Sequence, residues 1–458
     1  MISILINAYA CSPGMGSEPG MAWNWCVNLA KYCELHIITE GEFWEKIENS
    51  LTPNSLTPSS FSKEEGSDMP LSNELLKDSI PKDGWIDNAP VNEYGLTATQ
   101  IRNLHFYYNP IGGDNNERCA KIRRMCWNQG DWRFYKYYRQ WQWRTYLMAR
   151  EICKRHHIDV IHQLNMIGFR EPGYLWKIEG VPLVWGPVDA KDAFPVEYLD
   201  GAGFKVKAFM SLKNRITQWQ LQHSERVRNM VKRSSVVVSA SSNSQKAFKK
   251  YFGIDSPLIN ETGCYEKEAT EIKMTQKDTF DLLWVGKMDF RKQLVLAIRA
   301  VATAFHQDIH LHVVGGGDVS VYQNEAEKFG IMDLCIWHGA VLHDEVQRIM
   351  CQSDLFFFTS VAEGTPHVVL EAIGNGLPVL CFDTCGQGDC VNDKVGIKIP
   401  LTNPQQSVKD FAEQIEYLYS HRDVLKQMSD NCAEHRKKLS WDWKARQMVN
   451  LYNKILKQ

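Results

Sequence analysis

The chain has 458 residues, with 52 Lys and Arg against 54 Asp and Glu. This near balance of charge gives no global signal for nucleic acid or for a membrane surface. A chain of this length is too long for one hydrophobic core and suits two domains of about 200 residues each. The thirteen Cys are scattered without the spacing of a zinc site, so we expect reduced thiols that pack as small apolar side chains.

The first residues, Met1–Ala8, lack the basic start of a signal peptide and predict a buried strand instead. The sequence contains no run of eighteen apolar residues, so no membrane-spanning helix is expected. These features predict a soluble cytoplasmic protein.

The N-terminal half predicts strands that alternate with helices or loops. A helix is expected at Met21–Lys31. The expected strands are Ile2–Asn7, Leu35–Thr39, Asp159–His162, Leu183–Trp185 and Val236–Ser239.

The segment from residue 49 to about 100 breaks this pattern. It contains a short tandem repeat, Asn49–Pro53 followed by Asn54–Pro58, and is rich in Ser, Pro, Asn and charge. Such a composition buries little apolar surface, so we expect a mobile insertion that adds nothing to the chemistry.

Residues 118–155 combine many basic and aromatic side chains with only two acids, Asp131 and Glu151. One interpretation is a surface that rests on anionic lipid, which would suit an acceptor carried on a polyprenyl diphosphate. The other is a helix with aromatic residues in the core and a solvated basic face. No recognisable nucleic-acid module accompanies the segment.

The C-terminal half alternates more regularly. Helical periodicities at Lys292–Phe305 and Val319–Phe329 separate apolar strands, and short joints containing Gly connect them. The expected strands are Phe280–Val285, Ile309–Val314, Leu334–Trp337, Leu355–Phe358 and Pro378–Phe382. Strand and helix in turn indicate βαβ units and a parallel sheet, so the fold class is α/β.

Two acids eight positions apart, Glu363 and Glu371, stand between the strand Asp354–Ser360 and an apolar helical stretch. In an open parallel sheet this order places Glu363 at the carboxyl edge of a strand, where ligands bind. The first amides of the helix point above that edge. Glu371 lies about two turns further on, on the helix face that looks back to the same crevice.

With Gly364 after the first acid, Ala372 after the second and Gly376-Leu-Pro378 closing the helix, the stretch resembles the Glu-x7-Glu motif of family 4 retaining glycosyltransferases. An ordinary strand–helix unit with two surface acids is the alternative. The resemblance implies the GT-B fold, in which two Rossmann-like, doubly wound parallel-sheet domains face a central cleft. It also implies that one acid lies near the reacting sugar and the other near the ribose hydroxyls.

The resemblance suggests that the chain is divided into three structural parts. Residues 1–262 would form the acceptor-binding domain, and residues 263–438 the nucleotide-sugar-binding domain. Residues 439–458, which include Ser440-Trp-Asp-Trp443, would form a helix that crosses back to the first domain.

A basic cluster follows the first strand of the second domain. Gly286, Lys287 and Lys292 resemble the family's Gly-Arg-x4-Lys element, with Lys287 at the Arg position and Gln293 where a Gly is usual. The two lysines would then grip the diphosphate, because fixed cations stabilise the charge that grows on the leaving phosphate. A solvated basic loop that opens a helix is the alternative, and Arg291 is expected to be a bystander.

The resemblance implies a donor site around the turn that opens the helix. Its residues would be Gly364, Thr365, Pro366, His367, Val368 and Glu371, with Glu363 in contact with the donor sugar. Pro366 has no N–H and therefore leaves fewer amides for the phosphates. No Asp-x-Asp motif follows a strand, so neither a metal nor another cofactor is expected.

The loop from Cys11 to Gly20 contains Gly14, Gly16, Ser17 and Glu18 between the first strand and its helix. Its spacing does not match a dinucleotide fingerprint. It resembles the glycine-rich loop that many family members hold against the donor, so Gly16 and Ser17 are candidate donor contacts; a structural turn is the alternative. Glu18 is a candidate contact for acceptor or donor hydroxyls.

His162 ends the strand that begins at Asp159. Family members often carry the pattern Asp-x-x-His-x-His here, but the second His would fall at Leu164, so His162 matches only the first, which is usually structural. His162 therefore stays a candidate catalytic residue, with Asn165 as the alternative polar group and Trp185–Asp189 as a possible wall of the same pocket.

The resemblance implies a retaining hexosyltransferase of bacterial surface polysaccharide assembly. Its partners would be a nucleoside diphosphate sugar and a glycan or polyprenyl-linked acceptor, with possible peripheral contact with the inner face of the cell membrane through residues 118–155 and no nucleic acid. Two alternatives from other classes are a GT-B nucleotide-sugar epimerase and a non-catalytic sugar-nucleotide-binding protein.

Overall fold

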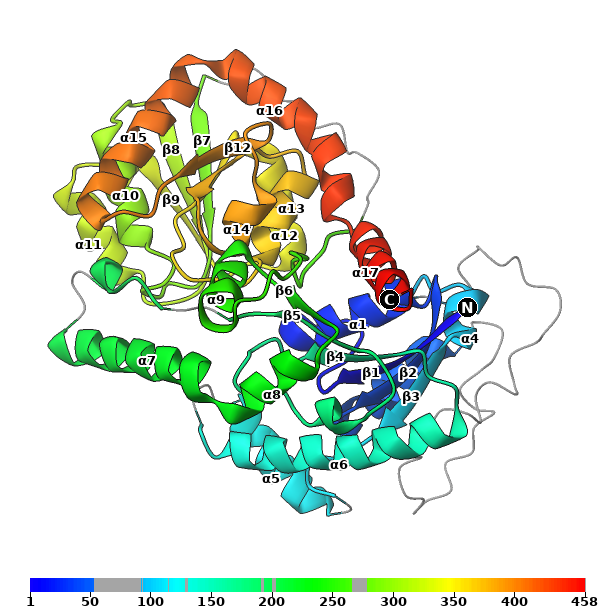
Figure 1. Cartoon of the computed structure of the whole chain (residues 1–458). Coiled ribbons are helices and arrows are strands. Elements are labelled where there is room, and N and C mark those ends of the chain that lie inside the picture. The colour runs from blue at the N-terminus through cyan, green and yellow to red at the C-terminus, as the bar shows by residue number, and fades with distance from the viewer. Residues whose placement is uncertain are drawn as a thin grey trace.

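The computed structural model describes residues 1–52, 92, 94–113, 115–127, 131–190, 193–199, 203–265 and 278–457. These residues form two six-stranded sheets in which the recorded strand pairs are parallel, each covered by helices (Figure 1). The prediction of two parallel-sheet units is therefore confirmed. Most of the predicted insertion at residues 49–100 lies outside the described residues.

The first sheet has the order β3-β2-β1-β4-β5-β6. Its strands are β1 (Ile2–Ala8), β2 (Cys33–Thr39), β3 (Leu104–Tyr108), β4 (Val160–Asn165), β5 (Leu183–Val188) and β6 (Val236–Ser239). Its helices are α1 (Ser17–Leu29), α2 (Trp44–Leu51), α4 (Ala98–Arg102), α5 (Asn116–Trp127), α6 (Phe134–Arg155), α7 (Phe204–His223), α8 (Glu225–Arg233) and α9 (Ser242–Phe252).

The second sheet has the order β12-β11-β10-β7-β8-β9. Its strands are β7 (Phe280–Val285), β8 (Ile309–Val314), β9 (Cys335–Gly339), β10 (Leu355–Phe358), β11 (Val379–Phe382) and β12 (Gly396–Ile399). Its helices are α10 (Leu294–Thr303), α11 (Ser320–Lys328), α12 (His343–Gln352), α13 (His367–Gly374), α14 (Cys385–Cys390), α15 (Pro404–Ser420) and α16 (Arg422–His435).

Both sheets have the doubly wound order 3-2-1-4-5-6 when each is numbered from its own first strand. The order reverses between β1 and β4 and between β7 and β10. Ligands of such sheets bind outside the carboxyl ends of the strands at this reversal. The central strands are buried on both faces, as expected for parallel sheets covered by helices.

The last helix, α17 (Trp441–Ile455), lies against α1 of the first domain (Figure 1). At its start, the carboxylate of Asp442 forms an ion pair with the ammonium group of Lys31 at 3.0 Å. Near its end, the Tyr452 hydroxyl lies 2.6 Å from Nδ1 of His162 in β4. The C-terminal segment therefore joins the core of the first domain although it follows the second in sequence.

The expected strand positions agree with the structure to within a few residues where apolar runs are continuous. The edge strands β3 and β12 were not predicted, and α1 begins at Ser17 rather than Met21. No helix among the described residues is both long and apolar enough to cross a membrane.

Within residues 118–155, the structure places a stripe of aromatic side chains in the core. Phe134, Tyr138 and Trp141 of α6 are at most 4% exposed, and each ring contacts that of Tyr9. Trp132 and Trp143 remain exposed. Much of the aromatic content of this segment therefore contributes to the fold of the first domain.

Candidate active site

A cavity of about 930 Å³ separates the two domains at the carboxyl edges of their sheets. On the first-domain side it is lined by residues 168–170, by α7 and by one face of α9. On the second-domain side it is lined by Arg291, Val361 and Thr384, which are loop residues next to β7, β10 and β11. The cavity lies where the topology predicts ligand binding, and Lys292 and Glu363 stand beside its lining residues rather than among them.

The structure brings Lys292 and Glu363 together at this edge. Nζ of Lys292 lies 2.7 Å from Oε1 of Glu363, and the side chains are 15% and 17% exposed. The Ser360 hydroxyl donates to the same Oε1 at 2.7 Å. The Lys292 ammonium also lies 5.0 Å from the centre of the Phe358 ring. A cation and a carboxylate thus stand at the end of β10, each with a small accessible area.

Hydrogen bonds hold the Lys292 loop against the end of β10. The Thr359 hydroxyl donates to the Lys292 carbonyl at 2.8 Å, and the Val361 amide donates to the Arg291 carbonyl at 2.9 Å. Gly286 makes room for the lysine, since a Cβ at this position would lie 3.3 Å from Cδ of Lys292. The loop is therefore fixed before any ligand arrives.

Gln293 adopts a left-handed conformation, with φ of 54°. A residue with a Cβ pays about 1–2 kcal/mol for this conformation, which explains why a Gly suits the position. Here the Gln293 side chain donates to the carbonyls of Tyr198 and Phe290 at 2.7 and 2.6 Å. These bonds to both domains offset the strain.

The other two basic residues of the cluster differ from Lys292. Lys287 is exposed and forms no ion pair with a described residue. Arg291 is held by Asp289 at 2.6 Å. Lys287 is therefore available for an anionic ligand, whereas Arg291 already has a partner.

Glu371 lies on α13 and faces α12. Its Oε2 accepts from Nε2 of Gln347 at 3.1 Å, and its Oε1 lies 3.5 Å from Nε2 of His343. Its side chain is 31% exposed. The acid is thus oriented by neighbours while one side stays accessible, as a contact for ribose hydroxyls requires.

The turn before α13 contains a partner that the sequence did not reveal. The Glu261 carboxylate accepts from both the amide and the hydroxyl of Thr365, the latter at 2.7 Å. Glu261 is 5% exposed and lies at the joint between the domains. Its interaction is visible only when residues 261 and 365 are brought together in space.

Gly364 is required by this contact, because a Cβ there would come within 2.4 Å of Oε1 of Glu261. Since Pro366 has no N–H and the Thr365 amide is occupied, the open amides of the turn are those of His367 and Val368. These are the first two residues of α13, whose amides have no acceptor within the helix.

His162 is fully buried. Its Nδ1 is bonded to the Tyr452 hydroxyl and its Nε2 to the carbonyl of Gly186. Burial lowers the pKa of His162 to about 4. Both ring nitrogens are thus engaged inside the protein, which argues against the catalytic role considered for His162 and favours a structural one.

The glycine-rich loop places Gly16 and Ser17 at the start of α1, with both residues exposed. Glu18 follows in the first turn. Its Oε1 accepts from the Ile167 amide at 3.2 Å, while its buried Oε2 has no hydrogen-bond partner in the part of the chain that the structure describes. Burial raises the pKa of Glu18 to about 7, and the nearby carboxylates of Glu261 and Asp189 add to the rise.

Asn165, the alternative polar group, is also anchored inside the protein. Its Nδ2 donates to the Ala10 carbonyl at 2.8 Å, and the residue is fully buried. Its Oδ1 has no partner among the described residues.

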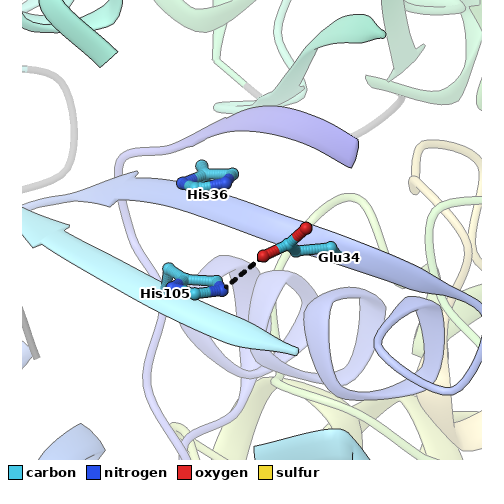
Figure 2. A group of neighbouring side chains, drawn as sticks. All are labelled: Glu34, His36 and His105. Carbon is cyan, nitrogen blue, oxygen red and sulfur yellow. Dashed lines mark hydrogen bonds and ion pairs between the residues drawn. The ribbon is translucent and has the colours of Figure 1, made fainter. Parts of the chain in front are cut away.

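Glu34, His36 and His105 are three possible metal ligands on neighbouring strands β2 and β3 (Figure 2). His105 and Glu34 are bonded at 3.0 Å, and His36 to the Tyr107 hydroxyl at 2.9 Å. The rings of His36 and His105 are stacked, with 10° between their planes. Stacked rings direct their lone pairs in separate parallel planes, so this geometry suits hydrogen bonding better than shared coordination.

Residues 266–435 match the family described as "Glycosyl transferases group 1". The match lies in the C-terminal half and covers less than half of the chain. The match covers Glu363, helix α13 with Glu371, and the loop with Lys287 and Lys292. The family predicted from the two acids is therefore confirmed.

The chain matches two curated relatives over only part of their length. The chain is 25% identical over 180 residues to an uncharacterized glycosyltransferase, MJ1607, of Methanocaldococcus jannaschii, covering 39% of this chain and 45% of the relative. It is 24% identical over 252 residues to protein CapJ of Staphylococcus aureus, covering 52% and 59%. The chain thus spans about half the length of these relatives.

Two solved structures share the fold over nearly the whole chain. Sucrose-phosphate synthase of Thermosynechococcus elongatus matches with a TM-score of 0.58 and 14% identity, covering 99% of each chain. HepE of Anabaena in complex with UDP matches with a TM-score of 0.54 and 13% identity, covering 99% of this chain and 100% of HepE. At this identity the likeness concerns the fold, and the predicted GT-B architecture is confirmed.

Proposed function

We propose that the protein is a retaining glycosyltransferase that moves a sugar from a nucleoside diphosphate sugar to a glycan or lipid-linked acceptor. The observation that carries this proposal is the pair Lys292–Glu363 at the carboxyl edge of β10, with Glu371 further along α13. The family match in this domain and the UDP complex of HepE support a nucleotide-sugar donor.

The first step required is stabilisation of the leaving diphosphate. The bond between the anomeric carbon and the phosphate oxygen breaks, and negative charge grows on that oxygen. Lys292 and Lys287 would neutralise this charge, aided by the amides of His367 and Val368 at the start of α13. Lys292 would then exchange its contact with Glu363 for one with the phosphate.

The two acids would position the donor. Glu363, once released by Lys292, would accept hydrogen bonds from hydroxyls of the sugar, while Glu371 would accept them from the ribose. Retention of the anomeric configuration requires that the acceptor hydroxyl attack the same face of the sugar from which the phosphate departs. The departing phosphate oxygen would take the proton of the acceptor hydroxyl. Such a step depends on positioning and electrostatics.

On the acceptor side, Glu18 has a buried oxygen to which no described residue donates a hydrogen bond. With its pKa near 7, the carboxyl group is protonated in a substantial fraction of molecules at neutral pH. It would then hydrogen-bond a hydroxyl of the acceptor or the donor sugar. The resemblance to polysaccharide-building enzymes supports an acceptor from bacterial surface polysaccharide assembly at the inner face of the cell membrane.

The donor site is tested by thermal unfolding with UDP, GDP and ADP and their sugars. A nucleotide at about a hundred times its Kd should stabilise the protein by about 2.7 kcal/mol. The stabilisation should disappear in Glu371→Ala and persist in the control Glu327→Ala, an exposed acid on α11. Absence of a shift with every nucleotide would contradict the proposal.

A second assay separates transfer from epimerisation. Release of the nucleoside diphosphate should require an added acceptor if the protein is a transferase. Conversion of the donor without any acceptor and without nucleotide release would instead indicate an epimerase.

A further inference from the structure

Helix α7 exposes a stripe of large apolar side chains. Phe209, Leu212, Ile216 and Trp219 are 63%, 57%, 48% and 60% exposed. Their spacing of three, four and three residues places them on one face of the helix. A single exposed apolar side chain is ordinary, but a continuous stripe marks an interaction surface.

The inner face of α7 is fixed to the first domain. Met210 and Leu221 are buried, and Arg170 donates to the hydroxyl of Thr217 at 2.7 Å. Asn214 exchanges two hydrogen bonds with the backbone of Phe194, at 2.9 and 2.8 Å. The helix is therefore held along its length while the apolar stripe stays exposed, with Phe209 at the boundary to the cavity, and it extends along the periphery of the molecule (Figure 1).

The charge of α7 has one sign. The helix contains Lys205, Lys207, Lys213 and Arg215 but no Asp or Glu. At about 100° per residue, Lys213 and Arg215 fall on opposite sides of the apolar stripe. Neither forms an ion pair with a described residue. Apolar insertion flanked by cations matches a surface with an apolar interior and anionic headgroups.

The same features disfavour a second copy of this chain as the occupant. Two α7 helices packed face to face would bring their basic flanks together without a compensating acid. Trp219 and Phe209 add aromatic rings, which suit the boundary between headgroups and acyl chains.

We propose that α7 binds the surface of an anionic bilayer, with its apolar stripe inserted among the headgroups. The stripe on α7 is more continuous than any exposed on α6, whose aromatic residues are largely buried. We therefore assign the membrane contact to α7 rather than to residues 118–155.

The position of α7 also connects the membrane to the cavity. Val206, Phe209, Lys213 and Thr217 of this helix line the cavity between the domains. The link between membrane and cavity rests on the proposed function, whereas the membrane contact of α7 does not. In a transfer to a lipid-linked acceptor, the acceptor would reach the site while its lipid stays in the bilayer.

The test uses the full chain and sedimentation with phosphatidylcholine vesicles, with and without phosphatidylglycerol. The protein should sediment with the anionic vesicles and far less with neutral ones, and high salt should weaken binding. The double variant Leu212→Gln and Trp219→Gln should lose binding by about tenfold or more. The matched variant Trp143→Gln and Leu147→Gln on α6 should bind as the original protein does.

A second variant, Lys205→Ala with Arg215→Ala, should lose the preference for anionic vesicles and leaves the apolar stripe intact. Nucleotide-induced thermal stabilisation checks that each variant is folded, and it tests the donor site separately from the membrane contact. Failure of the original protein to bind anionic vesicles, or an equal loss in the α6 variant, would overturn the proposal. A dimer in sedimentation velocity that α7 substitutions dissociate, without vesicle binding, would assign the stripe to a second copy instead.

Discussion

The end of β10 and the middle of β4 hold charged or ionisable groups in opposite settings, since His162 lies inside β4 and not at its end as predicted. After β10, Lys292 and Glu363 are paired yet keep an accessible area, next to loop residues that line the cavity. In β4, His162 is fully buried between Tyr452 and the carbonyl of Gly186. A place on or after a central strand of the sheet therefore favours a ligand contact only where the side chain keeps an accessible area, as Lys292 and Glu363 do and His162 does not.

The largest effect is expected from Lys292→Met. Removing a fixed cation from the leaving phosphate should lower kcat by about a hundredfold to a thousandfold. Steady-state release of the nucleoside diphosphate in the presence of acceptor measures it. Arg291→Ala, in the same loop but paired with Asp289, is the control and should stay within about threefold of the original rate.

His162→Gln should give the opposite pattern, with loss of stability and little change in kcat for the folded protein. The folded pKa lies near 4, below the ordinary 6.5. The neutral ring therefore contributes stability that is present above pH 6.5 and is lost as pH falls toward 4. The free energy of unfolding lost over this pH range is on the order of 3 kcal/mol.

Urea unfolding at pH 7 and pH 4.5 measures this effect. The original protein should lose much of this stability between the two values, and His162→Gln should lose less. A fall in kcat of a hundredfold with unchanged stability would assign His162 to the chemistry and remove the contrast between His162 and the Lys292–Glu363 pair.

Glu18 provides an effect of similar size and opposite sign. Its folded pKa, about 7, lies above the ordinary 4.5, so its contribution is fully present below pH 4.5 and lost as pH rises through 7. The loss is at most on the order of 3 kcal/mol. Glu18→Gln should be more stable than the original protein at pH 8 and should show a flatter profile from pH 5 to 8 in urea unfolding.

The smallest effect is expected from metal removal. Lysines and helix amides would supply the positive charge at the phosphate, so EDTA should leave the transfer rate unchanged. Complete loss on chelation, restored by Mg²⁺ or Mn²⁺, would show that these groups are insufficient.

The sequence was sufficient where structure depends on local pattern. Continuous apolar runs such as Leu355–Phe358 predicted buried parallel strands, and the family resemblance led to Lys292 and Glu363, which the fold then brings within 2.7 Å. The edge strand β12 was missed because Gly396–Ile399 is short and only partly apolar.

The remainder depends on contacts between distant segments. Glu261 occupies the Thr365 amide across the joint between the domains, and Tyr452 fixes His162 from the last helix. Neither partner is marked by local sequence. In the same way, α6 and α7 both combine basic residues with large apolar ones, and only tertiary packing shows which apolar face stays exposed.

The role of Lys292 and Glu363 in a retaining transfer is tested most directly by ¹H NMR of the reaction with the donor that stabilises the protein. The new glycosidic bond should have the anomeric configuration of the donor, and its signal should be nearly absent in Lys292→Met. An inverted anomer, or formation of product by Lys292→Met at the original rate, would contradict the proposed site.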